Sequence, residues 1–466
     1  MARHDQRESP PELQDLRIEP RSIDSLKLRR NNPRTHSEKQ IRQIADSIET
    51  FGFTNPVLID ASDTVIAGHG RVRAAKRLGI EQVPTVRLEH FSPEQVRAYV
   101  IADNRLAECA GWDRDLLAME IQELAEIDLD FDLEVMGFET GELDLLMGGA
   151  AAEQGVDPAD AEPDGEPDGP TVSRVGDLWE IGRHRLLCGD SLEGGSYDRL
   201  MTGKKAQLVF VDPPYNVRID GHVSGLGQAR HGEFRMASGE MSEAEFTGFL
   251  KTALAHHAAH SVDGALHFVC MDWRHGAELL AASRDIYAEY KNLCVWAKTN
   301  AGMGSLYRSQ HELVHVFKVG TAPHTNNIEL GRYGRTRSNV WRYAGVNSFG
   351  SERDEALAMH PTVKPVRLVA DAILDCSRRG DRVLDGFVGS GTTLLAAERT
   401  GRIGYGLEIE PSYVDAATRR LAEHAGLEAV HAETRRTFAE VAEARAVPVE
   451  SDSLTSTESS ARTEEA

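Results

Sequence analysis

The segment Asp212-Pro213-Pro214-Tyr215 combines a carboxylate, two prolines and an aromatic ring directly after an apolar run, residues 208–211. Such a run is typical of a buried parallel strand, whose carboxyl end lies at the sheet edge where α/β active sites are found. The exocyclic amino nitrogen of a nucleobase is a poor nucleophile because its lone pair is delocalised into the ring. The Asp212 carboxylate and the Pro213 carbonyl could accept its two hydrogens, since the prolines stiffen the turn, and Tyr215 could stack on an extruded base. The pattern predicts this amino-group chemistry, with a plain strand-ending turn as the alternative.

A second candidate site is a glycine-rich turn between a strand and a helix. Gly389 and Gly391 would let the backbone approach a ligand closely, and the N–H groups at the helix start near Thr392 would suit a carboxylate. The glycine spacing is not Gly-x-Gly-x-x-Gly, so a dinucleotide is the poorer interpretation. Glu408 follows the next strand, 23 residues after Asp385, a distance at which an acid commonly binds ribose hydroxyls. A plain connection between strand and helix is the alternative.

The elements that must position these residues alternate between short apolar strands and helical patterns from residue 172 to residue 446. This alternation predicts an α/β domain with a parallel sheet covered by helices on both faces. An earlier block, residues 16–147, has strand and helix patterns of its own and predicts a smaller second domain. The candidate strands of the larger domain are residues 207–211, 265–271, 293–298, 313–318, 382–384 and 404–407.

Two acidic segments hold half of the net charge of −22. Residues 148–171 contain seven acids and no base, and residues 447–466 contain five acids and one arginine. We expect both to be solvated and disordered, the first as a linker and the second as a tail. The remaining chain is also acidic, so contact with nucleic acid would need a local basic patch.

The five cysteines lie far apart and form no Cys-x-x-Cys pair. Their spacing argues against a disulfide framework and against a zinc site, so no metal is predicted, and it fits a reducing compartment. The N-terminus is charged and has no apolar signal core, and no run approaches the length of a membrane span. These features predict a cytoplasmic protein without a membrane partner.

The order of the two motifs resembles that of the amino-group DNA methyltransferases, in the permuted class whose Asp-Pro-Pro-Tyr precedes the Phe-x-Gly-x-Gly loop. Residues 360–365 and 185–191 resemble two further segments of that family. The resemblance implies a Rossmann-like sheet and methyl transfer from S-adenosylmethionine to an exocyclic amino group in double-stranded DNA, with adenine N6 favoured over cytosine N4. The catalytic residues that it implies are Asp212, Pro213, Pro214 and Tyr215, and the cofactor-binding residues are Asp190, Thr362, Lys364, Asp385, Phe387, Gly389, Gly391, Thr392 and Glu408.

Other interpretations stay open at this point. Glutamine or RNA amino methyltransferases use a similar tetrapeptide, but they usually have asparagine at the position of Asp212 and place the glycine loop first. A partition-like DNA-binding regulator with an inactive methylase half is the alternative from another class. One departure from the family is Gly386, where relatives often carry proline, and the glycine is expected to loosen the turn. The recognition sequence, the oligomeric state and a companion restriction nuclease are not encoded in any pattern.

The basic and aromatic segment 326–349 is the candidate reader of DNA. It contains four arginines and one acid, and Tyr333, Trp341 and Tyr343 are interleaved with the arginines. Arginines bind phosphates and guanine edges, and aromatic rings stack on bases. By position the segment matches the target-recognition region of the family, about residues 320–355, with a solvated loop as the alternative. The DNA-binding candidates are Arg332, Arg335, Arg337 and Arg342.

The N-terminal block resembles the α+β ParB/sulfiredoxin-like domain that is often fused to such methyltransferases. Residues 55–68 predict a hairpin, and a basic helical pattern follows at residues 71–78. In relatives the turn corresponding to Gly68-His69-Gly70-Arg71 binds phosphates at a helix start. His69 stands where sulfiredoxins need a cysteine, so that activity is not expected. A site for a nucleotide or for DNA is the prediction, with a purely structural His69 as the alternative.

Overall fold

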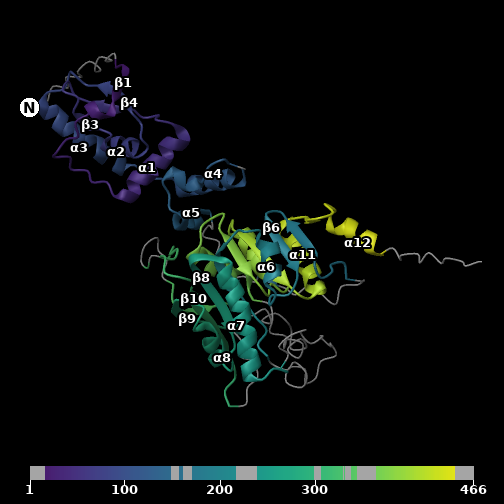
Figure 1. Cartoon of the computed structure of the whole chain (residues 1–466). Coiled ribbons are helices and arrows are strands. Elements are labelled where there is room, and N and C mark those ends of the chain that lie inside the picture. Colours follow the sequence, from purple (N-terminus) through teal and green to yellow (C-terminus); the bar gives the residue numbers. More distant parts are fainter. Residues whose placement is uncertain are drawn as a thin grey trace, which may run out of the picture. The chain divides into compact units, whose positions relative to one another are not determined.

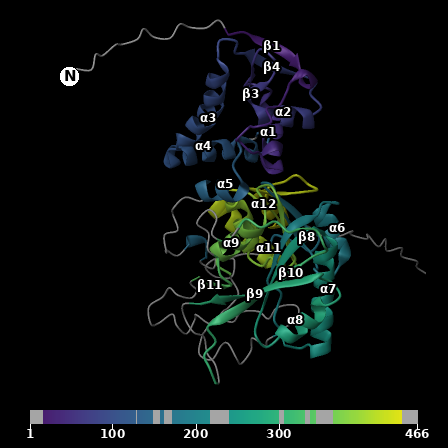
Figure 2. The same ribbon diagram turned by 90° about the vertical axis from the view of Figure 1, so that its left-hand side faces the viewer.

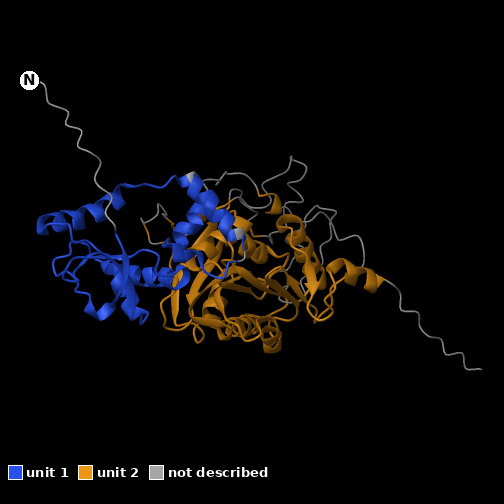
Figure 3. Cartoon of the chain, turned by 90° about the horizontal axis from the view of Figure 1, so that it is seen from above, with its two compact units in different colours: residues 1–152 blue, residues 153–466 orange. Residues whose placement is uncertain are grey.

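The chain folds into two compact units, residues 1–152 and residues 153–466 (Figure 3). The computed structural model describes residues 16–127, 129–147, 157–160, 171–216, 239–298, 306–328, 330, 337–343 and 364–446. The expected tail and most of the expected linker lie outside these residues. Within the described ranges, no helix is long and apolar enough to cross a membrane.

Unit 1 contains the strands β1 (Ile18–Ser22), β2 (Val57–Ile59), β3 (Val65–Ala67) and β4 (Gln82–Arg87) and the helices α1 (Glu38–Phe51), α2 (His69–Arg77), α3 (Pro93–Cys109), α4 (Arg114–Glu126) and α5 (Thr140–Met147). Its sheet has the order β1-β4-β2-β3. The predicted hairpin is confirmed as the antiparallel pair β2–β3, and the predicted basic helix is α2. Ser92 begins α3 with a capping box, because its side chain and that of Gln95 satisfy each other's backbone N–H groups.

Unit 2 contains the strands β5 (Leu178–Ile181), β6 (His184–Cys188), β7 (Ala206–Val211), β8 (Ser261–Met271), β9 (Glu289–Ala297), β10 (His311–Lys318), β11 (Val340–Arg342), β12 (Arg382–Asp385), β13 (Ile403–Glu408) and β14 (Ala429–His431). They form one sheet in the order β11-β9-β10-β8-β7-β12-β13-β6-β5-β14. The six predicted strands are confirmed, but the prediction of a parallel sheet is only partly right. β8, β7, β12, β13 and β6 are parallel to one another, whereas β10 is antiparallel to β8 and β9, and β5 is antiparallel to β6 and β14. A short turn joins β5 to β6, and such a connection permits only an antiparallel pair.

Helices cover both faces of the sheet (Figures 1 and 2). They are α6 (Gly194–Met201), α7 (Glu243–Ala259), α8 (Gly276–Ser283), α9 (Val366–Cys376), α10 (Thr392–Arg399), α11 (Pro411–Ala425) and α12 (Phe438–Ala446). Alternate residues of β7 belong to two cores: Leu208 and Phe210 pack with α9, α10 and α11, and Val209 and Val211 pack with α6, α7 and α8. Burial on both faces explains why this strand is a continuous apolar run.

The structure corrects the prediction of a disordered linker at residues 157–160. This segment includes a short 3₁₀ helix, Pro158–Asp160, that packs on unit 2. Ala159 is fully buried in the core that contains α9 and α10, and Asp157 pairs with Arg399. Composition suggested disorder because it reports average polarity, whereas a single small apolar residue is enough to fill one gap in a core.

Candidate functional site

Four acidic residues lie at the carboxyl edge of four neighbouring parallel strands. Asp190 and Asp212 follow β6 and β7, while Asp385 and Glu408 end β12 and β13. The chain runs from β12 to β13 in one direction across the sheet and from β7 to β8 in the opposite direction, so the order reverses between β7 and β12. Ligands of open α/β sheets bind in the crevice at such a switch point. The fold therefore brings both predicted motifs to one place.

Asp212 is the centre of a buried polar cluster. Its Oδ1 accepts a hydrogen bond from the Tyr215 hydroxyl at 2.5 Å, and its Oδ2 accepts one from Lys364 Nζ at 2.6 Å. The Asp212 side chain is 23% exposed and that of Lys364 is 5% exposed. Lys364 Nζ also lies 5.6 Å from the centre of the Tyr215 ring. The resemblance predicted Lys364 at the cofactor, whereas the structure places its ammonium against the carboxylate of the Asp-Pro-Pro-Tyr segment.

Two residues that the sequence analysis missed complete this cluster. Glu312, from β10, contacts Lys364 at 2.8 Å and Lys298 at 2.5 Å. The chain Lys298–Glu312–Lys364–Asp212 thus alternates in charge and sums to zero, which a buried cluster requires. The available signal for Glu312 was an acid near the start of a strand.

The charges of this cluster shift one another's pKa values. Burial raises the pKa of Asp212, Lys364 opposes that rise and Glu312 adds to it, so the pKa stays above its ordinary value. Burial would also raise the pKa of Glu312, but the two lysines outweigh it and lower that pKa to about 2. Desolvation would lower the pKa of Lys364, yet Asp212 and Glu312 raise it. Lys364 is therefore a permanent cation that favours the ionised form of Asp212.

The glycine loop is fixed by hydrogen bonds to the acids at the ends of β12 and β13. Asp385 accepts from the Phe387 N–H at 2.9 Å and from the Thr393 hydroxyl at 2.6 Å. Glu408 accepts from the Gly389 N–H at 3.0 Å. Burial raises the pKa of Asp385 and that of Glu408 to about 7 each, even though these donors lower it. Both carboxyls are hence poised to change charge near neutral pH.

Unit 1 has a cavity of about 180 Å³ at the start of α2. The predicted residues Gly68, His69, Gly70 and Arg71 all line it. Gly68 caps the helix with φ +103°, a conformation that favours glycine. Burial lowers the pKa of His69 to about 4, so its ring is neutral, and its Nε2 has no hydrogen-bond partner within the described structure. The cavity also contains Asn32, Arg34, His36, Ile44, Ile66, Ala67, Asp103 and Asn104.

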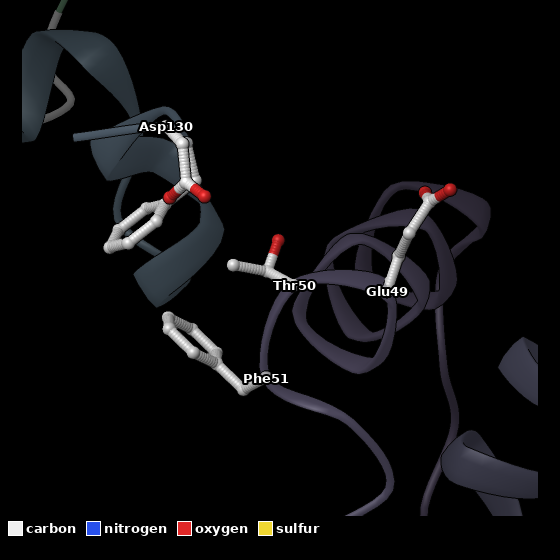
Figure 4. Close-up of a pocket in the computed structure, with 5 residues that line it drawn as sticks. Glu49, Thr50, Phe51 and Asp130 are labelled. Carbon is white, nitrogen blue, oxygen red and sulfur yellow. The ribbon is translucent and has the colours of Figure 1, made fainter.

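A second hollow in unit 1, of about 290 Å³, is lined by Glu49, Thr50, Phe51, Asp130 and Phe131 (Figure 4). The rings of Phe51 and Phe131 meet edge to face with centroids 5.4 Å apart. Among these five lining residues the polar side chains are two carboxylates and a hydroxyl, so we assign no chemistry to the hollow.

Three family models match the chain, and together they span both units. A DNA methylase model of the N6 and N4 type matches residues 206–419. A ParB N-terminal domain model matches residues 8–104, and a ParB-methyltransferase helix-turn-helix model matches residues 115–175. Residues 206–419 belong to the N6/N4 DNA methylase family. The chain also carries a ParB-like N-terminal domain.

Curated relatives match each unit of this methylase separately. The ParB-like nuclease domain-containing protein YnaK of Escherichia coli is 46% identical over 80 residues, which are 17% of this chain and 92% of that protein. The type II methyltransferase M2.DpnII of Streptococcus pneumoniae is 28% identical over 236 residues, 47% of this chain and 84% of that protein. Among solved structures, the M1.HpyAVI–SAM complex is 19% identical and covers 51% of this chain and 98% of that chain, with a TM-score of 0.38.

In this methylase, Gly386 does not loosen the turn as the sequence suggested. A Cβ atom at this position would lie 2.5 Å from His257 Nε2 and 2.8 Å from the Tyr197 hydroxyl. Both of these side chains are fully buried. The position is therefore tightly packed, and glycine leaves the space that the His257 and Tyr197 side chains occupy.

The other predicted cofactor residues have mixed outcomes. Thr362 lies outside the described residues. Thr392 is the first residue of α10, and its hydroxyl accepts a hydrogen bond from Arg420 at 2.8 Å. Asp190 Oδ1 accepts from the Leu192 N–H at 2.8 Å and so shapes the loop after β6. The Phe387 ring packs 5.9 Å from that of Phe249.

The four arginines predicted to contact DNA also have mixed outcomes. Arg332 and Arg335 lie outside the described residues, and Arg342 is exposed on β11. Arg337 instead pairs with Asp375 at 2.9 Å and with Asp371 at 3.2 Å, both on α9. Its guanidinium therefore joins the segment just before β11 to α9, which is a structural role that the basic composition of the segment did not reveal.

Proposed function

We propose that this methylase transfers the methyl group of S-adenosylmethionine to N6 of adenine in double-stranded DNA. The main support is the position of Asp212 at the switch point, on the strand next to the one that ends in Asp385. Methyl transfer to N4 of cytosine is the alternative. Adenine is favoured because relatives that act on cytosine commonly have serine at the position of Asp212.

In this proposal Asp212 accepts one hydrogen of the target amino group and the Pro213 carbonyl accepts the other. The two acceptors draw the nitrogen lone pair out of conjugation, so that it can attack. S-adenosylmethionine supplies an electrophilic methyl group and leaves as a neutral thioether. Lys364, at 2.6 Å from Asp212, favours the ionised carboxylate on which this role depends. The proton that the amino group loses passes to Asp212 or to water.

The Tyr215 hydroxyl occupies the Asp212 oxygen that the amino group would need. A carboxylate oxygen has two lone pairs, so the base could either share it or displace the hydroxyl. Displacement would free the Tyr215 ring to stack on the base, which is worth about 1–3 kcal/mol.

For the cofactor we propose Asp190, Asp385, Phe387, Gly389, Gly391 and Glu408. Carboxylates suit ribose hydroxyls and an ammonium group as hydrogen-bond acceptors. The loop N–H groups before α10 suit the carboxylate of the methionine moiety. Both kinds of group lie at the same sheet edge as Asp212.

Asp212→Ala tests this function directly. We expect it to abolish methylation of DNA while the affinity for S-adenosylmethionine, measured by calorimetry, stays within about threefold, or less than 1 kcal/mol. Sequencing of modified bases in DNA from cells that express the wild type would identify the base. Near-normal methylation by Asp212→Ala would refute the assignment, and methylated cytosine N4 would select the alternative.

We also propose that the cavity at the start of α2 binds phosphate groups, from a nucleotide or from DNA. Helix N-termini favour anions, and Arg34 and Arg71 add two guanidinium groups to the cavity that His69 also lines, where its Nε2 has no hydrogen-bond partner among the described residues. Titration of Arg71→Ala and wild type with nucleoside triphosphates and with a short duplex separates the two ligands. Equal affinity of both proteins for every ligand would refute the site.

A further inference from the structure

The described part of the linker, residues 157–160, contacts the glycine loop through Arg420. The guanidinium of Arg420, on α11, donates to the Ala159 carbonyl through Nη2 at 2.7 Å and Nε at 3.0 Å. Its third nitrogen, Nη1, donates to the Thr392 hydroxyl at 2.8 Å and to Ser390 Oγ at 3.1 Å. One side chain, 4% exposed, thus joins the linker to the last residues of the glycine loop.

A second contact of the linker is with the start of α9. Asp160 Oδ1 accepts the backbone N–H of Val366 at 2.8 Å. Val366 is the first residue of α9, where N–H groups have no partner within the helix and favour an acid. Lys364, which binds Asp212, lies two residues earlier. The same linker segment therefore holds the start of α10 through Arg420 and the start of α9 through Asp160.

Ala159 explains why the segment stays in place. Its side chain is fully buried in the core together with Val366, Leu394 and Ala417. Asp157 adds an ion pair with Arg399, the last residue of α10. Three neighbouring linker residues thus contact α9, α10 and α11, the helices that surround the glycine loop.

We propose that residues 157–160 are a positioning element of the S-adenosylmethionine site, and that the linker in this way belongs to the working methylase unit. The inference rests on the proposed cofactor residues. The helix-turn-helix family model, residues 115–175, includes the same segment, whereas its contacts assign it to unit 2. One piece of chain thus belongs to the N-terminal module by sequence and to the cofactor site by structure.

Point variants of the full chain test the proposal. Asp160→Ala removes the acceptor for the Val366 N–H, and we expect the dissociation constant for S-adenosylmethionine to rise about three- to tenfold, as for one lost buried hydrogen bond. Ala159→Glu would place a charge in a closed core site, so the segment should detach and the constant should rise more than about tenfold. The KM for DNA should change less than about twofold in both variants, because the contacts of both residues are with the helices beside the glycine loop.

Two control variants separate positioning from general damage. Asp160→Asn keeps an oxygen that can accept the Val366 N–H, so it should bind S-adenosylmethionine like the wild type. Asp168→Ala removes one charge from the same acidic stretch and should also be neutral, because the proposal assigns the positioning contacts to residues 157–160 alone. Because Ala159→Glu could prevent folding, the pair Asp160→Ala and Asp160→Asn decides the outcome.

If Asp160→Ala lowers only the melting temperature and leaves the dissociation constant for S-adenosylmethionine unchanged, the proposal is overturned, and the segment contributes to stability alone. An equal rise in the KM values for DNA and for S-adenosylmethionine would also overturn it. Failure of the wild type to bind S-adenosylmethionine would instead refute the proposed function itself, so the two failures are distinguishable.

Discussion

Replacing Lys364 with methionine should separate its contact with Asp212 from the role at the cofactor that the sequence suggested. The ammonium lies 2.6 Å from Asp212 and 2.8 Å from Glu312. Unit charges about 2.6 Å apart interact by about 6 kcal/mol at an effective dielectric constant of about 20, and desolvation of the ions offsets part of this. Loss of one partner from a buried pair costs about 3–5 kcal/mol.

The variant Lys364→Met would leave Asp212 and Glu312 close together without their shared cation. The pKa of Asp212, already raised by burial and by Glu312, should rise further, so that the protonated form dominates at neutral pH. A protonated carboxyl is a weaker acceptor for the amino hydrogens. If about 3 kcal/mol is lost from the transition state, kcat at pH 7 should fall about 100-fold. The fall should be partly reversed as the pH is raised, because Asp212 then ionises.

The assay is a profile of kcat against pH, with calorimetry of S-adenosylmethionine binding on the same proteins. Lys298→Met is the matched control, since Lys298 contacts Glu312 whereas the ion pair of Asp212 is with Lys364, and it should lower kcat far less. If Lys364→Met instead weakens cofactor binding while kcat and its pH profile are unchanged, Lys364 serves the cofactor and our reasoning about Asp212 is wrong.

Three other predictions follow from charges and boundaries. Burial raises the pKa of Asp385 and of Glu408 to about 7, so each group binds more protons in the folded state, and its contribution lowers the free energy of unfolding as pH rises from about 4.5 to 7. The affinity for S-adenosylmethionine should rise over about pH 6–8 as the two carboxyls ionise. Glu408→Gln should flatten both trends, the first measured by thermal melts and the second by calorimetry. Arg73→Ala should make the salt dependence of DNA binding shallower by about 0.9 if this exposed residue contacts a phosphate, and an unchanged slope would exclude that contact. A chain that starts at residue 153 should fold and bind S-adenosylmethionine, whereas one that starts at residue 172 should bind it more weakly, and equal affinity would show that the linker contact is dispensable.

Local patterns were sufficient for the elements and for the acids at strand ends. The apolar run before Asp212 predicts a strand that is buried on both faces, and β7 is such a strand. The distance from Asp385 to Glu408 predicts two consecutive strands with a helix between them, and β12, α10 and β13 match it. These predictions succeed because periodicity, turn residues and strand ends depend on neighbours within a few residues.

The direction of the outer strands depended on tertiary structure. An apolar run is equally compatible with a parallel and an antiparallel neighbour, so β10 could not be distinguished from β8 by composition. Arg337 also had to be placed in space before its role was visible, because an arginine that binds phosphate and one that pairs with Asp375 have the same local sequence.

The sequence by itself predicted the methylase family and one candidate site, since the residue types that can accept amino hydrogens or approach a cofactor are few and are expected after strands. Only the tertiary structure decided how these residues are held. Lys364 reaches Asp212 from 152 positions away in the chain, and Asp160 reaches Val366 from 206 positions away. No local pattern records such pairs, because burial and charge balance arise only when distant segments share one core.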